Sequence, residues 1–212
     1  MEGEQCCAHD RASTVQRGKK LEYFTLSWCS LEALVGITSG VLAGSVALVG
    51  FGFDSVIEVG SGAALLWRLG LDDTGRREHA EKVTLRIVGA FFLGLAVYVA
   101  YDSLKSLVGR EAPAESSVGI GLALVSLIVM PLLARAKRNV ATGIQSAAMH
   151  VDARQAQFCM YLSAILLGGL LLNALLGWWW ADPAAGLVMV PIIAKEGFDA
   201  VRGKACADCA CH

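Results

Sequence analysis

The stretch SVALVGFGFDSVIEVGSGAALLW, residues 45–67, holds two acids inside an otherwise apolar segment. Asp54 and Glu58 are four residues apart, so a helix would carry both carboxylates on one face. An acid at the centre of a bilayer costs about 2.5–3.5 kcal/mol or more on insertion scales, and such residues usually mark a functional site. The pair therefore predicts a cation or proton site inside a membrane. Two protonated acids bonded to neighbouring helices are the structural alternative.

The composition is typical of a membrane protein. Hydrophobic residues make up 55% of the 212 positions and charged residues only 17%, and the mean hydropathy is +0.55. A formal net charge of −1 gives no basic footprint for nucleic acid. The chain is long enough for one bundle of spanning helices in the lipid bilayer, with short tails.

A helix needs about 20 predominantly apolar residues to cross a bilayer. Six segments meet this length: 24–44, 46–67, 86–107, 118–135, 148–176 and 181–198. Because a segment in lipid must satisfy its backbone internally, all six should be helices. We therefore expect an all-α membrane protein, a six-transmembrane-helix bundle. Asp182 followed by Pro183 predicts the N-cap and first residue of the sixth helix.

Lysine and arginine gather on one side of these spans. They are Arg11, Arg17, Lys19 and Lys20 in the first tail, Arg68, Arg76, Arg77, Lys82 and Arg86 around the second connection, Arg135, Lys137 and Arg138 in the fourth, and Lys195, Arg202 and Lys204 at the end. The opposite side holds Arg110, with Lys105 near it. The positive-inside rule then places both termini in the cytoplasm, in a plasma or inner membrane. The predicted parts are an N-terminal tail 1–23, a membrane domain 24–203 and a Cys/His-rich tail 204–212.

Few other polar groups fall within the spans. Glu32 lies in the first, where a proton relay, a contact to the ligand shell and a buried helix contact are all open readings. Gln155 and Cys159 lie in the fifth, again four residues apart, and Asp152 precedes Gln155 by three. A lone cysteine is more often a small buried hydrophobe, but here it follows a glutamine on the same helical face.

The tails carry a second group of metal-binding residue types. Five of the seven cysteines lie there, and the group consists of Cys6, Cys7 and His9 at one end and Cys206, Cys209, Cys211 and His212 at the other. A cytoplasmic placement disfavours disulfides, and C-x-x-C with a nearby histidine is zinc-type spacing. The tails therefore predict a metal site at the C-terminal end, for which Cys6, Cys7 or His9 are further candidate ligands. Whether the two tails share one site stays open, and disordered tails that bind metal weakly are the alternative.

Three motifs together resemble one family. GFGFDSVIEVGSG (50–62) resembles the second helix of cation diffusion facilitators, where D-x-x-x-D supplies half of a metal site. MHVDARQAQFCMYLS (149–163) resembles the fifth helix, with A-D-A-x-H-x-x-x-D, and WWWADPAAGLVMVPIIAKEGFDAVRG (178–203) resembles the sixth. The resemblance covers the membrane domain. Within this family, the chain is similar to short members that lack the cytoplasmic C-terminal domain.

What the resemblance implies is a six-helix transporter that exports a divalent metal, commonly zinc, in exchange for protons. Its tetrahedral site, carried over residue by residue, is Asp54, Glu58, Gln155 and Cys159. Here glutamate replaces an aspartate, glutamine replaces the histidine and cysteine replaces the second aspartate. A thiolate suits soft metals, so we expect Zn²⁺ first and Cd²⁺ next as the substrate. Glu32 and Asp152 are candidates for the second shell or a proton relay.

Two other classes of function compete with an exporter. A membrane-embedded metal sensor or buffer would bind ions through the tails without moving them. An enzyme is not expected, because the spans carry no H-E-x-x-H and no serine or cysteine with a basic partner, and no organic cofactor motif occurs. The oligomeric state stays open, with a homodimer among the alternatives.

Overall fold

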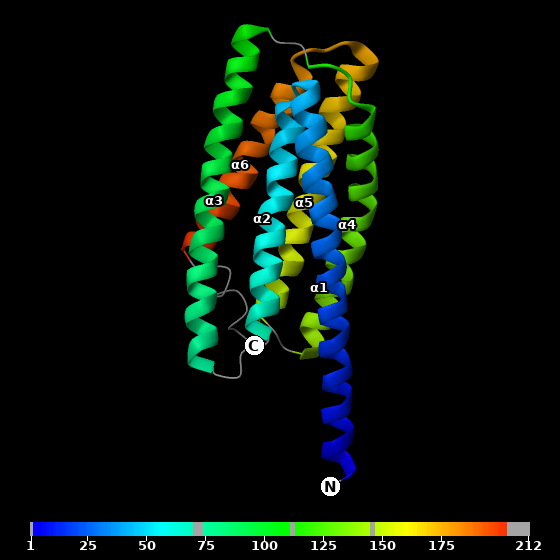
Figure 1. The fold of residues 1–212 in the computed structure, drawn as a ribbon, viewed down its shortest axis with the longest axis vertical. Coiled ribbons are helices and arrows are strands. Elements are labelled where there is room, and N and C mark those ends of the chain that lie inside the picture. Colours follow the sequence, from blue (N-terminus) through cyan, green and yellow to red (C-terminus); the bar gives the residue numbers. More distant parts are fainter. Residues whose placement is uncertain (1, 70–73, 111–112, 145–146, 203–212) are drawn as a thin grey trace.

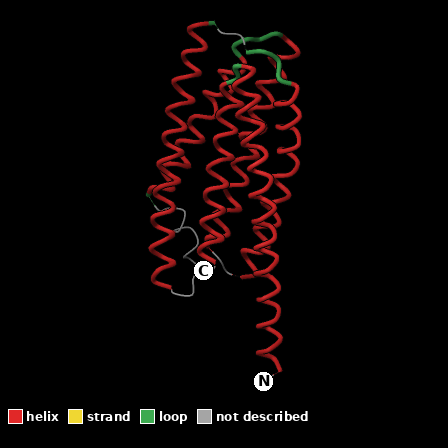
Figure 2. The backbone as a smooth tube through the Cα atoms, in the orientation of Figure 1, coloured by secondary structure: helices red, strands yellow, loops and turns green. Residues whose placement is uncertain are grey.

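The computed structural model describes residues 2–69, 74–110, 113–144 and 147–202, with side chains at residues 14–67, 83, 86–110, 113–143 and 149–202. Within these ranges the chain forms helices joined by short loops, and no strand occurs (Figure 2). The helices are α1 (Glu2–Ala43), α2 (Val46–Leu69), α3 (Thr74–Gly109), α4 (Ser117–Ile144), α5 (Ala147–Leu176) and α6 (Ala181–Val201). The predicted all-α bundle is confirmed.

Successive helices alternate in direction along a common axis (Figure 1). We call the end that holds the α1–α2, α3–α4 and α5–α6 connections the upper end, and the opposite end the lower end. Five described helices, α1 to α5, are long and apolar enough to cross a membrane. α6 has 21 residues and carries charged side chains in its first turn and its last two turns. A multi-pass membrane protein is thus confirmed, while the side on which each end lies stays a prediction.

Three helices extend further than the predicted spans. α1 continues well before residue 24, α3 begins at Thr74 instead of 86, and α4 runs to Ile144 instead of 135. Hydropathy locates only the apolar part of a helix, and a helix continues into polar sequence when no residue breaks it. The segment 136–144 contains no proline and no glycine before Gly143, so the expected charged loop at 135–138 is helical and that prediction was wrong.

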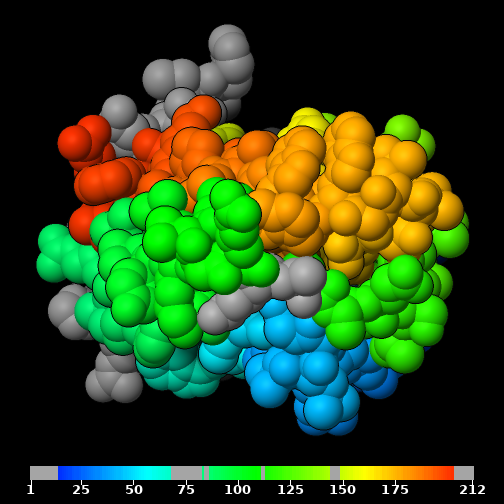
Figure 3. Space-filling view, turned by 90° about the horizontal axis from the view of Figure 1, so that it is seen from above, coloured from blue at the N-terminus to red at the C-terminus, as the bar shows by residue number. Residues whose placement is uncertain are grey.

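Four helices form a bundle and two pack beside it. α1 packs against α2 and α4, and α5 also packs against α2 and α4, so α1 and α5 lie at opposite corners. α3 and α6 form a close pair that contacts α2, and α6 also contacts α5 (Figure 1). The view from above shows α1 and α2 along one side and the α5–α6 connection along the other (Figure 3). The four-helix bundle therefore has an interior of its own.

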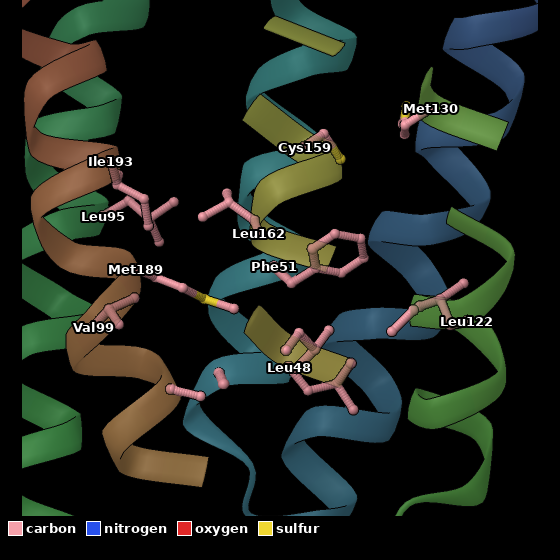
Figure 4. Close-up of a cluster of buried hydrophobic side chains, with 14 of the residues drawn as sticks. Leu48, Phe51, Leu95, Val99, Leu122, Met130, Cys159, Leu162, Met189 and Ile193 are labelled. Atoms are coloured by element: carbon pink, nitrogen blue, oxygen red, sulfur yellow. The ribbon is translucent and has the colours of Figure 1, made fainter. Parts of the chain in front are cut away.

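One apolar core joins the two groups of helices (Figure 4). Leu95 and Val99 of α3 face Met189 and Ile193 of α6 on one side of the close-up, and Leu48 and Phe51 of α2 lie with Leu162 of α5 at its centre. Leu122 and Met130 of α4 complete it on the other side. In lipid this packing acts through close contact instead of water release, because lipid tails are as apolar as the side chains.

Two glycines allow α1 and α2 to touch backbone to backbone. A Cβ on Gly40 would lie 2.8 Å from the Val49 nitrogen, and one on Gly52 would lie 2.7 Å from the Ile37 nitrogen. No larger residue fits at these distances, so the small residues set the close approach of the two helices. This brings the polar side chains of α1 and α2 to the same interior.

Asp182 corrects one prediction about the sixth helix. α6 begins at Ala181, its N-cap residue is Trp180, and no side chain caps it. The Asp182 carboxylate is fully buried and instead accepts hydrogen bonds from Ser45 Oγ at 2.5 Å and from the Val46 N–H at 3.0 Å. The first N–H groups of α2 lack partners within their own helix, which makes this start a binding place for a carboxylate. Asp182 thus ties α6 to α2 at the upper end.

We predict that Asp182→Ala lowers the melting temperature of the purified protein in detergent. Two buried donors at the start of α2 lose their acceptor, at a cost of about 1–3 kcal/mol. Asp199→Ala near the other end of α6 is the matched control and should change little. An equal melting temperature for the two variants would contradict the assigned tie.

Candidate metal centre

Asp54 and Glu58 lie one turn apart on the buried face of α2. Their side chains are 4% and 1% exposed, while Phe53 and Val56 on the outer face are 41% and 46% exposed. The spacing of four residues and the close contacts of α2 with α1 and α5 turn both carboxylates inward. The structure therefore places two acids side by side inside the bundle.

Gln155 and Cys159 face them from α5. Cys159 is 1% exposed, is a free thiol, and lies beside both the Asp54 and the Glu58 carboxylate. The Gln155 amide oxygen accepts a hydrogen bond from Ser61 Oγ at 2.8 Å, and Ser61 is one turn along α2 from Glu58. The amide nitrogen of Gln155 is buried and has no hydrogen-bond partner. The structure thus brings Cys159 to both acids and holds Gln155 beside the same turn of α2.

Among the described side chains, no group of three or more His, Cys, Asp or Glu is close enough together to hold a metal ion. The ligand set therefore stays a prediction. Its tail counterpart also stays one, because the side chains of Cys6, Cys7, His9, Cys206, Cys209, Cys211 and His212 lie outside the described residues.

Cys29 on α1 is a candidate that sequence reasoning missed. Its thiol is free and fully buried, and it lies beside the Glu58 carboxylate. Two thiols from α1 and α5 thus flank one acid of α2. The sequence spacing could have indicated Cys29 as a candidate. It precedes Glu32 by three residues and therefore lies on the same helical face.

Glu32 joins three helices of the bundle. Its carboxylate is fully buried and accepts hydrogen bonds from Ser126 Oγ of α4 and, at 3.4 Å, from Ser55 Oγ of α2. It also lies within electrostatic range of Glu58. The buried helix contact is therefore present, and the roles as relay or shell residue stay predictions.

A second polar cluster lies below the candidate ligands and corrects the sequence reading. Lys137, expected in a cytoplasmic loop, is fully buried within α4. Its ammonium lies 3.2 Å from Glu22 Oε1 and donates a hydrogen bond to Asp152 Oδ2. Glu22, expected in the N-terminal tail, is fully buried on α1. Asp152, a candidate relay, is an ion-pair partner in the structure.

The buried polar residues of α1 could have been found from their spacing. Glu22, Thr25, Cys29 and Glu32 recur every three or four residues, and each is 2% exposed or less. That period places them on one helical face, which is the face that a bundle buries. The predicted first span began at residue 24, so it separated Glu22 from the other three residues of this face.

Comparison with known proteins gives one family and several relatives. The family model described as the cation efflux transmembrane domain matches residues 24–204. The uncharacterized transporter MJ0449 of Methanocaldococcus jannaschii is 26% identical over 181 residues, which are 80% of this chain and 62% of that protein. Transmembrane protein 163 of Xenopus laevis is 25% identical over 182 residues, 81% of this chain and 63% of that protein.

A third relative carries a more specific description. The cation-efflux pump FieF of Shewanella oneidensis is 22% identical over 120 residues, 57% of this chain and 40% of that protein. The chain therefore spans less than two thirds of the length of each of these relatives. The family model covers part of α1 and all of α2 to α6.

Glu58 and Glu32 should respond in opposite ways to removal of their charge. Both carboxylate oxygens of Glu58 are buried without a hydrogen-bond partner. Glu58→Leu should therefore raise the melting temperature of the chelator-treated protein, with a gain of about 1–3 kcal/mol in the free energy of unfolding. Glu32→Leu is the matched control, and it should lower the melting temperature because two serine hydroxyls lose their acceptor. A fall of the same size in both variants would contradict this account of Glu58.

Proposed function

Because this chain belongs to the cation efflux family, whose transmembrane domain matches residues 24–204, we propose that it moves a divalent metal ion across the membrane in exchange for protons. Zinc is the favoured substrate and cadmium the next. The single observation that supports this most is the set of buried Asp54, Glu58 and Cys159 side chains, which face one another from α2 and α5. The chain is an integral, multi-pass membrane protein and a cation transporter of this family.

The side chains that would bind the ion come from two different helices. Asp54 and Glu58 lie on α2, and Gln155 and Cys159 lie on α5. In the structure the four donors are near one another without forming a closed metal shell. Small shifts of two packed helices are a common way to change such a site between states. Binding would then draw the donors of α2 and α5 together.

The donor types favour a borderline or soft ion. Thiolate ligands select zinc, cadmium and copper over magnesium and calcium, and carboxylates keep the site suited to a divalent charge. The position of Cys29 beside Glu58 supports the same choice, because it offers a second sulfur near the same acid. An amide oxygen at Gln155 is a weaker ligand for zinc than an imidazole would be.

Proton exchange follows from the chemistry of the ligands. Carboxylates and thiols bind metal in their deprotonated forms, so an arriving ion releases protons and a departing ion allows them to return. Exchange also limits the net charge that the lipid-embedded bundle must hold. The direction proposed is from the cytoplasm outward. Uptake of zinc, cadmium and manganese into proteoliposomes, with and without an imposed pH gradient, tests both the transport and the coupling.

A metal sensor or buffer without transport is the second candidate. Its supporting observation is the clustering of cysteine and histidine in both tails. A buffer would bind zinc in detergent and give no uptake into liposomes above that of empty vesicles. The same flux assay therefore separates the two functions.

We predict that Asp54→Ala and Glu58→Ala each reduce zinc uptake into proteoliposomes by more than about tenfold, because each removes a ligand oxygen from the site. Asp102→Ala is the matched control, since it removes a partly exposed acid of α3, and it should keep most of the uptake. Size-exclusion profiles would establish that the variants fold. Near wild-type uptake by either site variant would exclude the assigned site.

We also predict that Cys159→Asp shifts the preference among metals. Replacing sulfur by oxygen weakens binding of cadmium more than of manganese, because soft ions favour thiolate. The measurement is the ratio of initial uptake rates of the two metals, with Cys29→Asp as a comparison at the neighbouring thiol. An unchanged ratio in Cys159→Asp would show that its sulfur does not contact the ion.

A further inference from the structure

Lys137 is a cation held inside the four-helix bundle with no exposed surface. Its ammonium pairs with Glu22 of α1 and Asp152 of α5, and Lys137 itself lies on α4. A buried charge of this kind is stable only when its partners remain in place, and removing one partner is strongly destabilising. The three side chains, which we call the lysine cluster, therefore hold the three helices together.

The lysine cluster lies between the candidate ligands and the lower end. A Cβ on Gly62 would lie 3.3 Å from Glu22 Oε2, and Gly62 is one turn beyond Glu58 toward the lower end of α2. Asp152 precedes Gln155 by three residues on α5, which begins at the lower end. Glu58 also lies within electrostatic range of Lys137 and Asp152. An ion moving through the bundle between the lower end and Glu58 would meet Lys137.

The cluster also joins two helices that pack little against each other. α1 and α5 occupy opposite corners of the bundle, and α4 packs against both. Lys137 reaches from α4 to an acid on each of them. Without this cation, the Glu22 and Asp152 carboxylates would repel each other across the interior. Lys137 therefore allows these two side chains of α1 and α5 to lie near one another at this level.

We propose that the lysine cluster is a gate of the transport path at the lower end. The gate is closed when the ammonium of Lys137 lies between Glu22 and Asp152, where it occupies both carboxylates and ties α1, α4 and α5 together. It opens when Lys137 leaves, and the two freed carboxylates then face an incoming divalent ion. The role as a gate rests on the proposed function, since it requires a path for the ion.

Access to Cys29 measures the state of this gate. Cys29 lies two turns beyond Glu22 on the same face of α1 and is fully buried. The reporter protein keeps Cys29 and carries serine at Cys6, Cys7, Cys159, Cys206, Cys209 and Cys211. In nanodiscs, a cationic methanethiosulfonate reagent should modify the reporter slowly. Adding Glu22→Gln, Lys137→Met and Asp152→Asn together should speed the modification by about tenfold or more, because the ion pairs that tie α1, α4 and α5 together at this level are then absent and local opening needs no charge separation.

Matched variants make the result specific. The neutral triple variant keeps side-chain volume and removes all three charges, so it should fold even if Lys137→Met alone does not. Arg138→Met removes the neighbouring, exposed cation of α4 and should leave the rate unchanged, and Lys137→Arg should keep it slow. A folded triple variant that is modified at the reporter's rate would overturn the gate and leave the cluster a purely structural contact.

Zinc uptake by the unmodified chain separates this test from that of the proposed function. Absence of uptake together with faster modification of the triple variant would exclude transport and retain an ion-paired closure of the lower end. Uptake by the unmodified chain together with an unchanged modification rate would exclude the gate alone.

Discussion

A charge inside a lipid-embedded bundle must find its partners within the protein, and the interior of this chain is organised around that constraint. Glu22, Glu32, Asp152 and Asp182 are each 5% exposed or less, and each receives hydrogen bonds or an ion pair from another helix. The donors lie on α4, on α2 or, for Ser45, at the residue directly before α2. The polar groups therefore connect helices that are distant in sequence, in addition to the apolar contacts of the core.

The partners differ between the two ends of the bundle. At the upper end, Asp182 accepts hydrogen bonds from a hydroxyl and a backbone N–H at the start of α2. The backbone N–H is available at any helix start, Ser45 adds the hydroxyl here, and the contact needs no second charge. At the lower end, two carboxylates share the one ammonium of Lys137. The upper contact fixes α2 against α6, whereas the lower contact depends on the position of one long side chain.

Glu58 differs from these four acids. Its two carboxylate oxygens have no hydrogen-bond partner, although two thiols and a charged lysine lie near it. Sequences are expected to break a local rule of this kind at functional sites, where binding of a ligand offsets the cost. An acid that lacks partners in the free protein is well suited to bind a cation, and this distinguishes Glu58 from Glu32, whose partners are already present.

The sequence predicted the helices well because lipid imposes one solution for an apolar segment of sufficient length. It predicted their ends poorly, since hydropathy reports which residues contact lipid and carries no information on where a helix stops. The same limit explains the missed lysine cluster. Lys137 follows Arg135 and precedes Arg138, so a count of charges places all three in a loop. Once α4 continues through them as a helix, Arg135 and Arg138 lie on the exposed face and Lys137 points into the bundle, where only the distant residues Glu22 and Asp152 make its burial favourable.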